Sequence, residues 1–193
     1  MSEKFIEGSL MQSLVTKEGR KVAIEKGLNF ISIDSIIKNQ VDLCPYGVAD
    51  MVQIEFFKSK SHGGVLIFHV IELKATELKV AHIAQLSRYI RGLESHLSKH
   101  EDFKGFKIGV QGVLLTLDNR NNRGDEVFLI DKVNNIDWYE YTFDIRGFNF
   151  FLQEKGWVRN EGIFKKSNYE IFGKLEMQRV LNFKNEILKA KKI

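Results

Sequence analysis

The sequence predicts an α/β fold with a mixed β-sheet flanked by helices. Segments with apolar residues every three or four positions alternate with short runs rich in β-branched and aromatic residues. The run from Val65 to Ala75 is almost continuously apolar, which is typical of a central strand buried on both faces. The chain has 193 residues, 44% of them hydrophobic, and one proline, so it is long enough to form one well-packed core.

The first half of the chain contains four predicted elements. Residues 2–17 follow helical spacing through Ile6, Leu10 and Leu14. Two segments, 27–33 and 41–57, are predicted to be extended because they are rich in β-branched and aromatic side chains. The polar, glycine-ended stretch 58–64 predicts a hairpin loop that leads into the central strand.

The second half begins with a change to helical periodicity, because leucines and isoleucines recur at steps of three and four residues. This predicts a long helix after the central strand and another in the tail. The expected helices are 76–99, a short one over 147–157, and 174–191, and the expected strands are 106–117, 127–130 and 136–143.

The tail is strongly basic. From Lys165 to Ile193 there are eight Lys or Arg residues against three Glu, whereas the whole chain carries a net charge of +4. Clustered lysines can bind phosphates, so the candidate nucleic-acid contacts are Lys184, Lys189, Lys191 and Lys192. A solvated helix face is the simpler alternative. The apolar residues of this helix could also dock it on the core or on a second subunit as a homodimer contact; they are Leu175, Val180, Leu181, Ile187 and Leu188.

Cysteine content and hydropathy exclude several classes of protein. The single cysteine, Cys44, rules out a disulfide within the chain and a four-cysteine zinc or iron–sulfur site. The longest apolar runs are only about strand length, so we expect no membrane-spanning segment and no membrane partner. We therefore expect a cytoplasmic protein.

The central strand ends with two charged residues on one face. Glu72 and Lys74 are two positions apart, and strand side chains alternate with period 2. Charged groups at the end of a buried strand cost free energy unless they are paired or bind a ligand. The acid-x-Lys pattern occurs three times in the chain, but only this one falls in a predicted strand. A purely structural ion-pair cluster at the end of the sheet is the alternative interpretation.

Asp50, in the stretch "GVAD", precedes the strand that the hairpin joins to the Glu72 strand. Neighbouring strands lie about 5 Å apart, so Asp50 meets Glu72 if the register matches. Two converging carboxylates form an oxygen-rich site that suits Mg²⁺, which takes one or two carboxylates together with waters and substrate phosphate.

The predicted helix after the Glu72 strand contains "AQLSRYI". Gln85 and Tyr89 are one helical turn apart and share a face, with Arg88 beside them. A chain that turns from the strand into this helix would bring that face over the carboxylates. Ordinary helix packing is the alternative for Gln85 and Tyr89. His82, earlier on the same helix, could approach the site, but a surface position is the preferred expectation.

The order "GVAD", "ELK" and "QLSRY" resembles the PD-(D/E)XK nuclease superfamily, specifically its RecB-type branch, across about residues 47–89. The resemblance implies a restriction-endonuclease-like core in a nuclease domain over residues 1–150, followed by a basic helical extension over 151–193. It further implies that Asp50 and Glu72 bind Mg²⁺, with Mn²⁺ able to replace it, and that Lys74 is the catalytic lysine. Gln85 and Tyr89 would support the site or contact DNA.

The family often adds an acid from the first helix. Glu7 is the preferred candidate for this further metal ligand because it shares a helical face with Leu10 and Leu14. Glu3 and Glu25 are the alternatives, and a solvated acid in the first turns of the helix is the structural explanation for Glu7.

These expectations describe a Mg²⁺-dependent deoxyribonuclease that hydrolyses phosphodiester bonds of DNA. The rival hypothesis is a non-catalytic nucleic-acid-binding module with a silent nuclease-like site. A third is an interaction protein that uses its tail helix. The joint presence of Asp50, Glu72 and Lys74 favours an enzyme.

Overall fold

The computed structural model describes residues 2–59, 63–103, 106–118, 124–133, 135–156, 159–160 and 171–190. Its helices are α1 (Glu3–Val15), α2 (Lys17–Glu25), α3 (Val80–Leu97), α4 (Asp125–Asp131) and α5 (Lys174–Ala190). Its strands are β1 (Ile36–Asp42), β2 (Val48–Ser59), β3 (Gly63–Leu73), β4 (Lys107–Leu117), β5 (Ile136–Asp144), β6 (Gly147–Glu154) and β7 (Arg159–Asn160). Two short 3₁₀ turns are η1 (Cys44–Tyr46) and η2 (Glu101–Phe103). The α/β class predicted from the sequence is confirmed.

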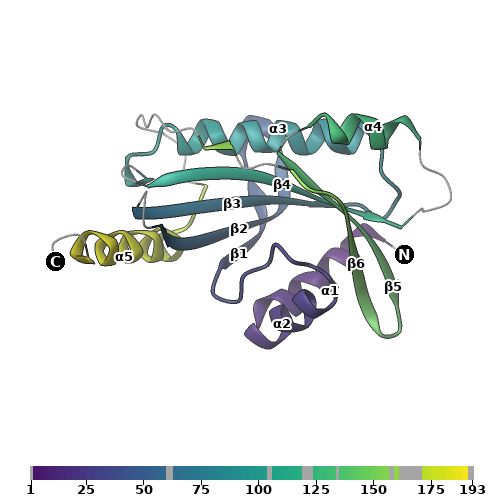
Figure 1. Cartoon of the computed structure of the whole chain (residues 1–193), viewed down its shortest axis with the longest axis horizontal. Coiled ribbons are helices and arrows are strands. Elements are labelled where there is room, and N and C mark those ends of the chain that lie inside the picture. The colour runs from purple at the N-terminus through teal and green to yellow at the C-terminus, as the bar shows by residue number, and fades with distance from the viewer. Residues whose placement is uncertain are drawn as a thin grey trace.

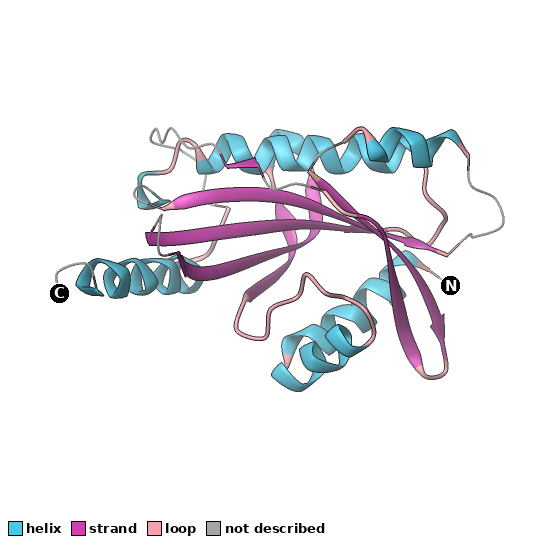
Figure 2. Ribbon diagram, viewed as in Figure 1, coloured by secondary structure: helices cyan, strands magenta, loops and turns pink. Residues whose placement is uncertain are grey.

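The strands form one mixed sheet in the order β1-β2-β3-β4-β5-β6, and the short β7 pairs with β4 (Figures 1 and 2). β1, β2 and β3 are antiparallel neighbours, whereas β3, β4 and β5 run parallel. Parallel strands need a crossover connection, and α3 supplies it between β3 and β4. β3 therefore has a partner on each side, which explains its nearly continuous apolar sequence.

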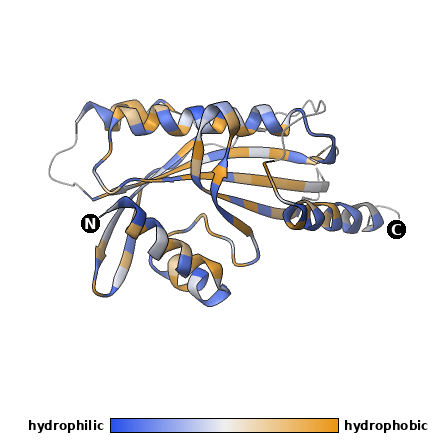
Figure 3. Cartoon of the chain, turned by 180° about the vertical axis from the view of Figure 1, so that it is seen from behind, coloured by the Kyte–Doolittle hydropathy of each residue, from blue (hydrophilic) through white to orange (hydrophobic). Residues whose placement is uncertain are grey.

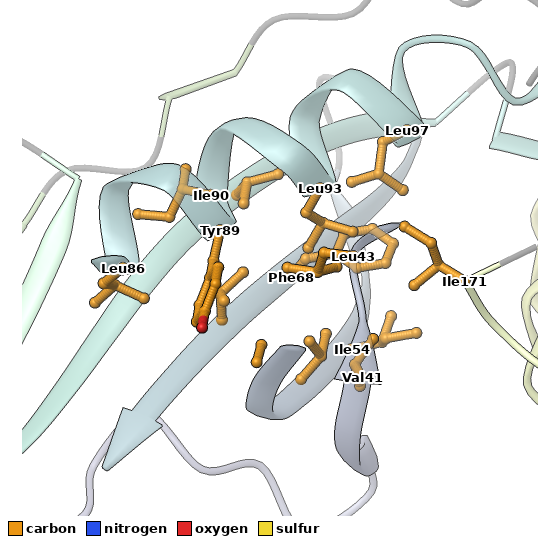
Figure 4. Packing of buried hydrophobic residues seen from close by; sticks show 14 of the residues in the cluster. Val41, Leu43, Ile54, Phe68, Leu86, Tyr89, Ile90, Leu93, Leu97 and Ile171 are labelled. Carbon is orange, nitrogen blue, oxygen red and sulfur yellow. The ribbon is translucent and has the colours of Figure 1, made fainter. Parts of the chain in front are cut away.

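Each face of the sheet has its own core. α3 and α4 cover one face and α1 and α2 lie on the other (Figure 1). Even-numbered residues of β3 such as Phe68 and Val70 belong to the α3 cluster, and odd-numbered ones such as Ile71 and Leu73 belong to the α1 cluster. This alternation places Glu72 on the α3 face. Figure 4 shows part of the α3 cluster, including Tyr89.

The N-terminal region differs from the sequence prediction in three places. Most of β1 was not predicted, and the expected extended segment 41–57 is divided among the end of β1, η1 and β2. The first predicted helix is followed by a second, because Thr16 ends α1 and accepts a hydrogen bond from the Gly19 amide (3.0 Å) as the N-cap of α2. The predicted extended segment 27–33 is wrong, since these residues form turns. Gly27 has a φ of 102°, which is outside the strand region. Leu28 and Ile31 are buried in the core although their segment is not part of the sheet.

Two predictions in the second half are also wrong. The expected strand 127–130 lies in α4, where Ile130 is buried while Phe128 is 66% exposed, so the apolar residues follow a helical face. The expected short helix 147–157 is mainly strand β6, in which Phe148 and Phe150 alternate inward. A run of aromatic residues is compatible with a helix or a strand. Here the antiparallel pairing with β5 makes it a strand.

The tail helix α5 is confirmed. Val180 is fully buried in the α3 cluster, and Phe183 stacks on Phe106 with ring centroids 6.1 Å apart. Leu175, in contrast, is 79% exposed. Hydrophobic and hydrophilic residues alternate along this helix (Figure 3). Its apolar residues Val180 and Phe183 pack against the α3 cluster. Among the described residues, none of the helices combines the length and apolar character needed to cross a membrane.

Candidate functional site

The β2–β3 hairpin brings Asp50 beside Glu72. Its antiparallel register pairs Met51 with Ile71. The preceding residue on β2, Asp50, therefore lies opposite the following residue on β3, Glu72. The Leu73 backbone amide donates a hydrogen bond to Oδ2 of Asp50 (2.8 Å). The condition stated from the sequence, that the register must match, is met.

Glu72 lies at the centre of a hydrogen-bonded group. Its Oε1 accepts from Lys74 Nζ and from Gln85 Nε2, both at 2.7 Å, and the residue is only 1% exposed. Lys74 Nζ also lies 3.2 Å from Oε1 of Glu3 in α1. The Lys74 amide continues the strand ladder to the Leu115 carbonyl (2.8 Å), which fixes the direction of its side chain.

Helix α3 supports this group from above the sheet. Gln85 Nε2 donates both to Glu72 and to the Tyr89 hydroxyl, the latter at 2.8 Å. Tyr89 is buried and projects from α3 beside Leu86 (Figure 4). The i, i+4 spacing of Gln85 and Tyr89 thus places both side chains over the strand end that carries Glu72.

Gly47, the glycine of "GVAD", makes room for Tyr89. Its φ of 112° and ψ of −165° lie in a region that other residues rarely adopt. A Cβ atom at this position would lie 2.8 Å from Cε1 of Tyr89. The glycine therefore permits the chain to turn from η1 into β2 directly against the tyrosine ring.

The two carboxyl groups are hard to ionise in the metal-free protein. Burial raises the pKa of Asp50 to about 6, although the Leu73 amide and Lys74 counteract this effect. Burial, followed by the charge of Asp50, raises the pKa of Glu72 to about 7 against the opposing effect of Lys74. Burial lowers the pKa of Lys74, but Glu72 and Glu3 outweigh it and raise the pKa overall, so Lys74 stays charged.

The donor set fits a hard divalent cation. Oε2 of Glu72 is buried without a hydrogen-bond partner in the described structure, and the nearby carboxylate of Asp50 repels it. A cation held by Asp50 and Glu72 would relieve both penalties. No cluster of three or more His, Cys, Asp or Glu that could hold a metal is present in the part of the chain that the structure describes. Mg²⁺ commonly uses only one or two protein carboxylates.

The remaining candidates from the sequence are three acids of α1 and α2 and Arg88 of α3. Glu7 accepts a hydrogen bond from Gln40 Nε2 (2.7 Å), and its charge contributes to raising the pKa of Asp50. Glu3, one helical turn earlier, is the α1 acid that pairs with Lys74. Glu25 is exposed at the end of α2. Arg88 is exposed, with its guanidinium carbon 5.6 Å from the Tyr89 ring centroid.

Two of the tail lysines, Lys184 and Lys189, lie on α5, which is remote in sequence from this group. Lys189 is exposed and Lys184 is half-buried. Lys191 and Lys192 lie outside the described residues.

One contributor was not identified from the sequence, and for a second, His82, the surface was preferred over the site. The Tyr141 hydroxyl donates to the Lys74 carbonyl (2.9 Å), a contact between strands that no local pattern could reveal. His82, expected at the surface, is half-buried, and its Nδ1 has no partner in the described structure. Burial, and then the charge of Lys74, lower its pKa, which places it beside the same group.

Comparisons of the chain with protein-family models, with curated proteins and with solved structures give no significant match.

Proposed function

We propose that this protein is a metal-dependent nuclease that hydrolyses phosphodiester bonds of DNA, with a restriction-endonuclease-like core of the PD-(D/E)XK, RecB-type kind. The observation that carries the proposal is the convergence of Asp50, Glu72 and Lys74 beneath Gln85. The three motifs lie on the consecutive elements β2, β3 and α3, as the resemblance requires.

In this proposal Asp50 and Glu72 hold Mg²⁺, and Glu7 or Glu3 adds a nearby negative charge. When bound, Mg²⁺ supplies Lewis-acid chemistry to the phosphodiester. Lys74 orients the attacking water or offsets the negative charge that develops on the phosphoryl oxygens. Water adds across the phosphorus–oxygen bond and the 3′ oxygen leaves, which yields a 5′ phosphate; this polarity comes from the resemblance.

Gln85 and Tyr89 act as positioning residues. Gln85 holds Oε1 of Glu72, so the unpartnered Oε2 stays available for a cation. Tyr89 in turn fixes Gln85. Arg88, exposed next to Tyr89, is suited to contact the DNA backbone.

The test is cleavage of plasmid DNA and of single- and double-stranded oligonucleotides with Mg²⁺, with Mn²⁺ and with a chelator. Wild-type protein should cleave only with metal, and Lys74→Ala should lose at least about a hundredfold in rate. Lys58→Ala, which alters an exposed lysine at the other end of β2, is the matched control and should retain activity.

Metal-independent DNA binding without cleavage would instead identify a binding module with a silent site. Near wild-type turnover by Lys74→Ala would contradict the role assigned to this lysine. Circular dichroism of each variant verifies that the fold is intact.

A further inference from the structure

A cavity of about 550 Å³ opens on the face of the sheet opposite Glu72. Its walls come from the 27–33 turns, from β2 to β6 and from the residues that follow β6; they include Phe30, His69, Gln111, Asp137, Tyr139 and Lys155. The strand residues among them belong to the α1 side, because His69 and Gln111 alternate with residues of the α3 cluster. A cavity of this size suits a small organic molecule.

Three buried polar residues, His69, Gln111 and Asp137, line the cavity, and Gln53, whose Oε1 is buried without a partner in the described structure, lies beside His69 on β2. Gln53, His69 and Gln111 lie in register across β2, β3 and β4, and each is at most 5% exposed. Asp137 on β5 is also 5% exposed; it accepts from the Gly156 amide (2.7 Å) and hydrogen-bonds with Gln111. Burying four polar side chains lowers the free energy of unfolding unless each one gains hydrogen bonds, because each must be desolvated.

Two residues that line the cavity, His69 and Tyr139, each have a polar atom for which no hydrogen bond to a described residue is shown, and in His69 this atom is Nε2. Nδ1 of His69 lies 3.2 Å from Gln53 Nε2, which also donates to the Phe30 carbonyl (2.9 Å). Gln53 is therefore the donor, Nδ1 accepts, and the proton of the neutral ring is assigned to Nε2. Burial lowers the pKa of His69 to about 4, so the ring is neutral near pH 7.

The Tyr139 hydroxyl is the second such atom. Tyr139 is 2% exposed and lines the cavity, and the structure shows no hydrogen bond from its hydroxyl to a described residue. His69 Nε2 is likewise without a shown partner. A ligand thus meets two N–H or O–H donors and the carboxyl group of Asp137 as an acceptor.

The cavity also has an aromatic wall. The Phe30 ring lies 5.4 Å from the His69 ring and 5.7 Å from the Tyr139 ring, measured between centroids. Such rings favour a flat, aromatic ligand. The lining also holds two carboxyl groups, Asp137 and Glu55, whose pKa burial raises, and one cation, Lys155, so it has no excess of positive charge that would attract an anion.

We propose that this cavity binds an amino-substituted heteroaromatic molecule of the size of a nucleobase or nucleoside. Ring nitrogens or carbonyl oxygens of the ligand accept from His69 and Tyr139, and its amino group donates to Asp137. The site is separate from the Glu72 group and does not depend on the proposed nuclease activity.

The test is calorimetric titration of the intact protein with adenosine, cytidine, uridine and spermidine, together with NMR mapping of the shifted amide signals. Adenosine or cytidine should bind, and uridine, which lacks the amino group, should bind at least about tenfold more weakly. Asp137→Asn should abolish that preference, since the amide still accepts from Gly156 but offers no charge to an amino group. Tyr139→Phe, which keeps the ring, should weaken both amino-bearing nucleosides about tenfold.

Asp34→Asn, which alters an exposed carboxylate in the turn before β1, is the matched control and should bind like wild type. Thermal unfolding and circular dichroism verify the fold of each variant. The proposal is overturned if no nucleoside binds at millimolar concentration, or if uridine binds as well as cytidine. It is also overturned if spermidine is the tightest ligand, which would indicate a cation site, or if Asp137→Asn and Tyr139→Phe change nothing.

Discussion

Glu72 has one carboxylate oxygen with two donors and another with none. Oε1 is held by Lys74 and Gln85, whereas Oε2 is buried without a partner among the described residues. Such asymmetry lowers stability, because a desolvated charged oxygen forfeits its interactions with water. A cation would restore these interactions, so the same feature that lowers the stability of the free protein favours metal binding.

Substitution of Glu72 should therefore change how stability depends on pH. Folding raises the pKa of Asp50 from 3.8 to about 6 and that of Glu72 from 4.5 to about 7. The native state thus binds more protons than the unfolded chain between about pH 4 and pH 7, and the free energy of unfolding falls as pH rises through that window. Glu72→Gln should flatten this decline and raise metal-free stability at pH 8, by on the order of 1–3 kcal/mol.

The measurement is urea unfolding of metal-free protein at pH 5, 6, 7 and 8. Glu25→Gln, at an exposed position on α2, is the control and should follow wild type. Added Mg²⁺ should stabilise wild type but have little effect on Glu72→Gln or Asp50→Asn. The same pH slope in Glu72→Gln and wild type would refute the assigned burial effect.

At the scale of secondary structure, three consecutive elements define the site. β2 contributes Asp50, β3 contributes Glu72 and leads to Lys74, and α3 contributes Gln85 and Tyr89. Gly47 allows β2 and α3 to pack closely, because its positive φ and missing side chain let the start of β2 approach Tyr89. The glycine of "GVAD" therefore has a packing role that is distinct from the chemistry of Asp50.

Gly47→Ala should lower the free energy of unfolding by about 1–3 kcal/mol, because alanine is strained at this φ and ψ. Its Cβ should also displace the Tyr89 ring, loosen Gln85 and reduce the proposed cleavage activity. Gly8→Ala is the control: Gly8 lies in α1 with no atom within 4 Å of a Cβ, so alanine should stabilise that helix by up to about 1 kcal/mol.

Denaturant unfolding of both variants, followed by their cleavage rates, measures these effects. An unperturbed Gly47→Ala protein would mean that Tyr89 can move aside without consequence for the site.

At the scale of the whole molecule, the sheet separates two polar regions. The Glu72 group lies on the α3 face at the end of β3, and the cavity with His69 and Asp137 lies on the other face. α5 adds a basic segment that is fastened to the core by Val180 and Phe183. Lys38 on β1 reaches the Ile171 carbonyl (3.4 Å) and Glu176 (3.9 Å), which ties the start of this segment to the edge of the sheet.

The lysines and the apolar residues of α5 should have separable roles. Replacing Lys184, Lys189, Lys191 and Lys192 by Gln should weaken DNA binding and flatten its salt dependence, with a loss of about 0.9 in log–log slope for each phosphate contact removed from duplex DNA. Stability should change little, because Lys189 is exposed and Lys184 is only half-buried. Binding isotherms at several salt concentrations measure the slope.

Phe183→Ala is the complementary variant and should lower the free energy of unfolding by about 2–3 kcal/mol through lost aromatic packing against Phe56 and Phe106. Leu175→Ala, at an exposed position on the same helix, should be nearly neutral. An unchanged salt slope in the four-lysine variant would leave α5 with a packing role only.

The sequence by itself determined the elements with strong and long periodicity and the residues of the motifs. β3, α3, β4, β5 and α5 were predicted because many side chains in each repeat the same burial pattern. The pairs Glu72 with Lys74 and Gln85 with Tyr89 were selected because two-residue and four-residue spacings fix which side chains share a face, and Asp50 was selected through the expected β-hairpin. Local geometry is enough for such inferences.

Only the tertiary structure decided what depends on distant partners. Residues 127–130 and 147–154 are short aromatic and aliphatic runs whose form is set by the surfaces they pack against. Glu3 and Glu7 lie on one face of α1, so the sequence does not distinguish them. The packing of α1 on the sheet pairs Glu3 with Lys74 and leaves Glu7 with Gln40. The polar row of Gln53, His69 and Gln111 arises from the register of three strands, and Asp137 on β5, which pairs with Val113, joins it through a hydrogen bond with Gln111, because residues far apart in sequence become neighbours only when the sheet forms.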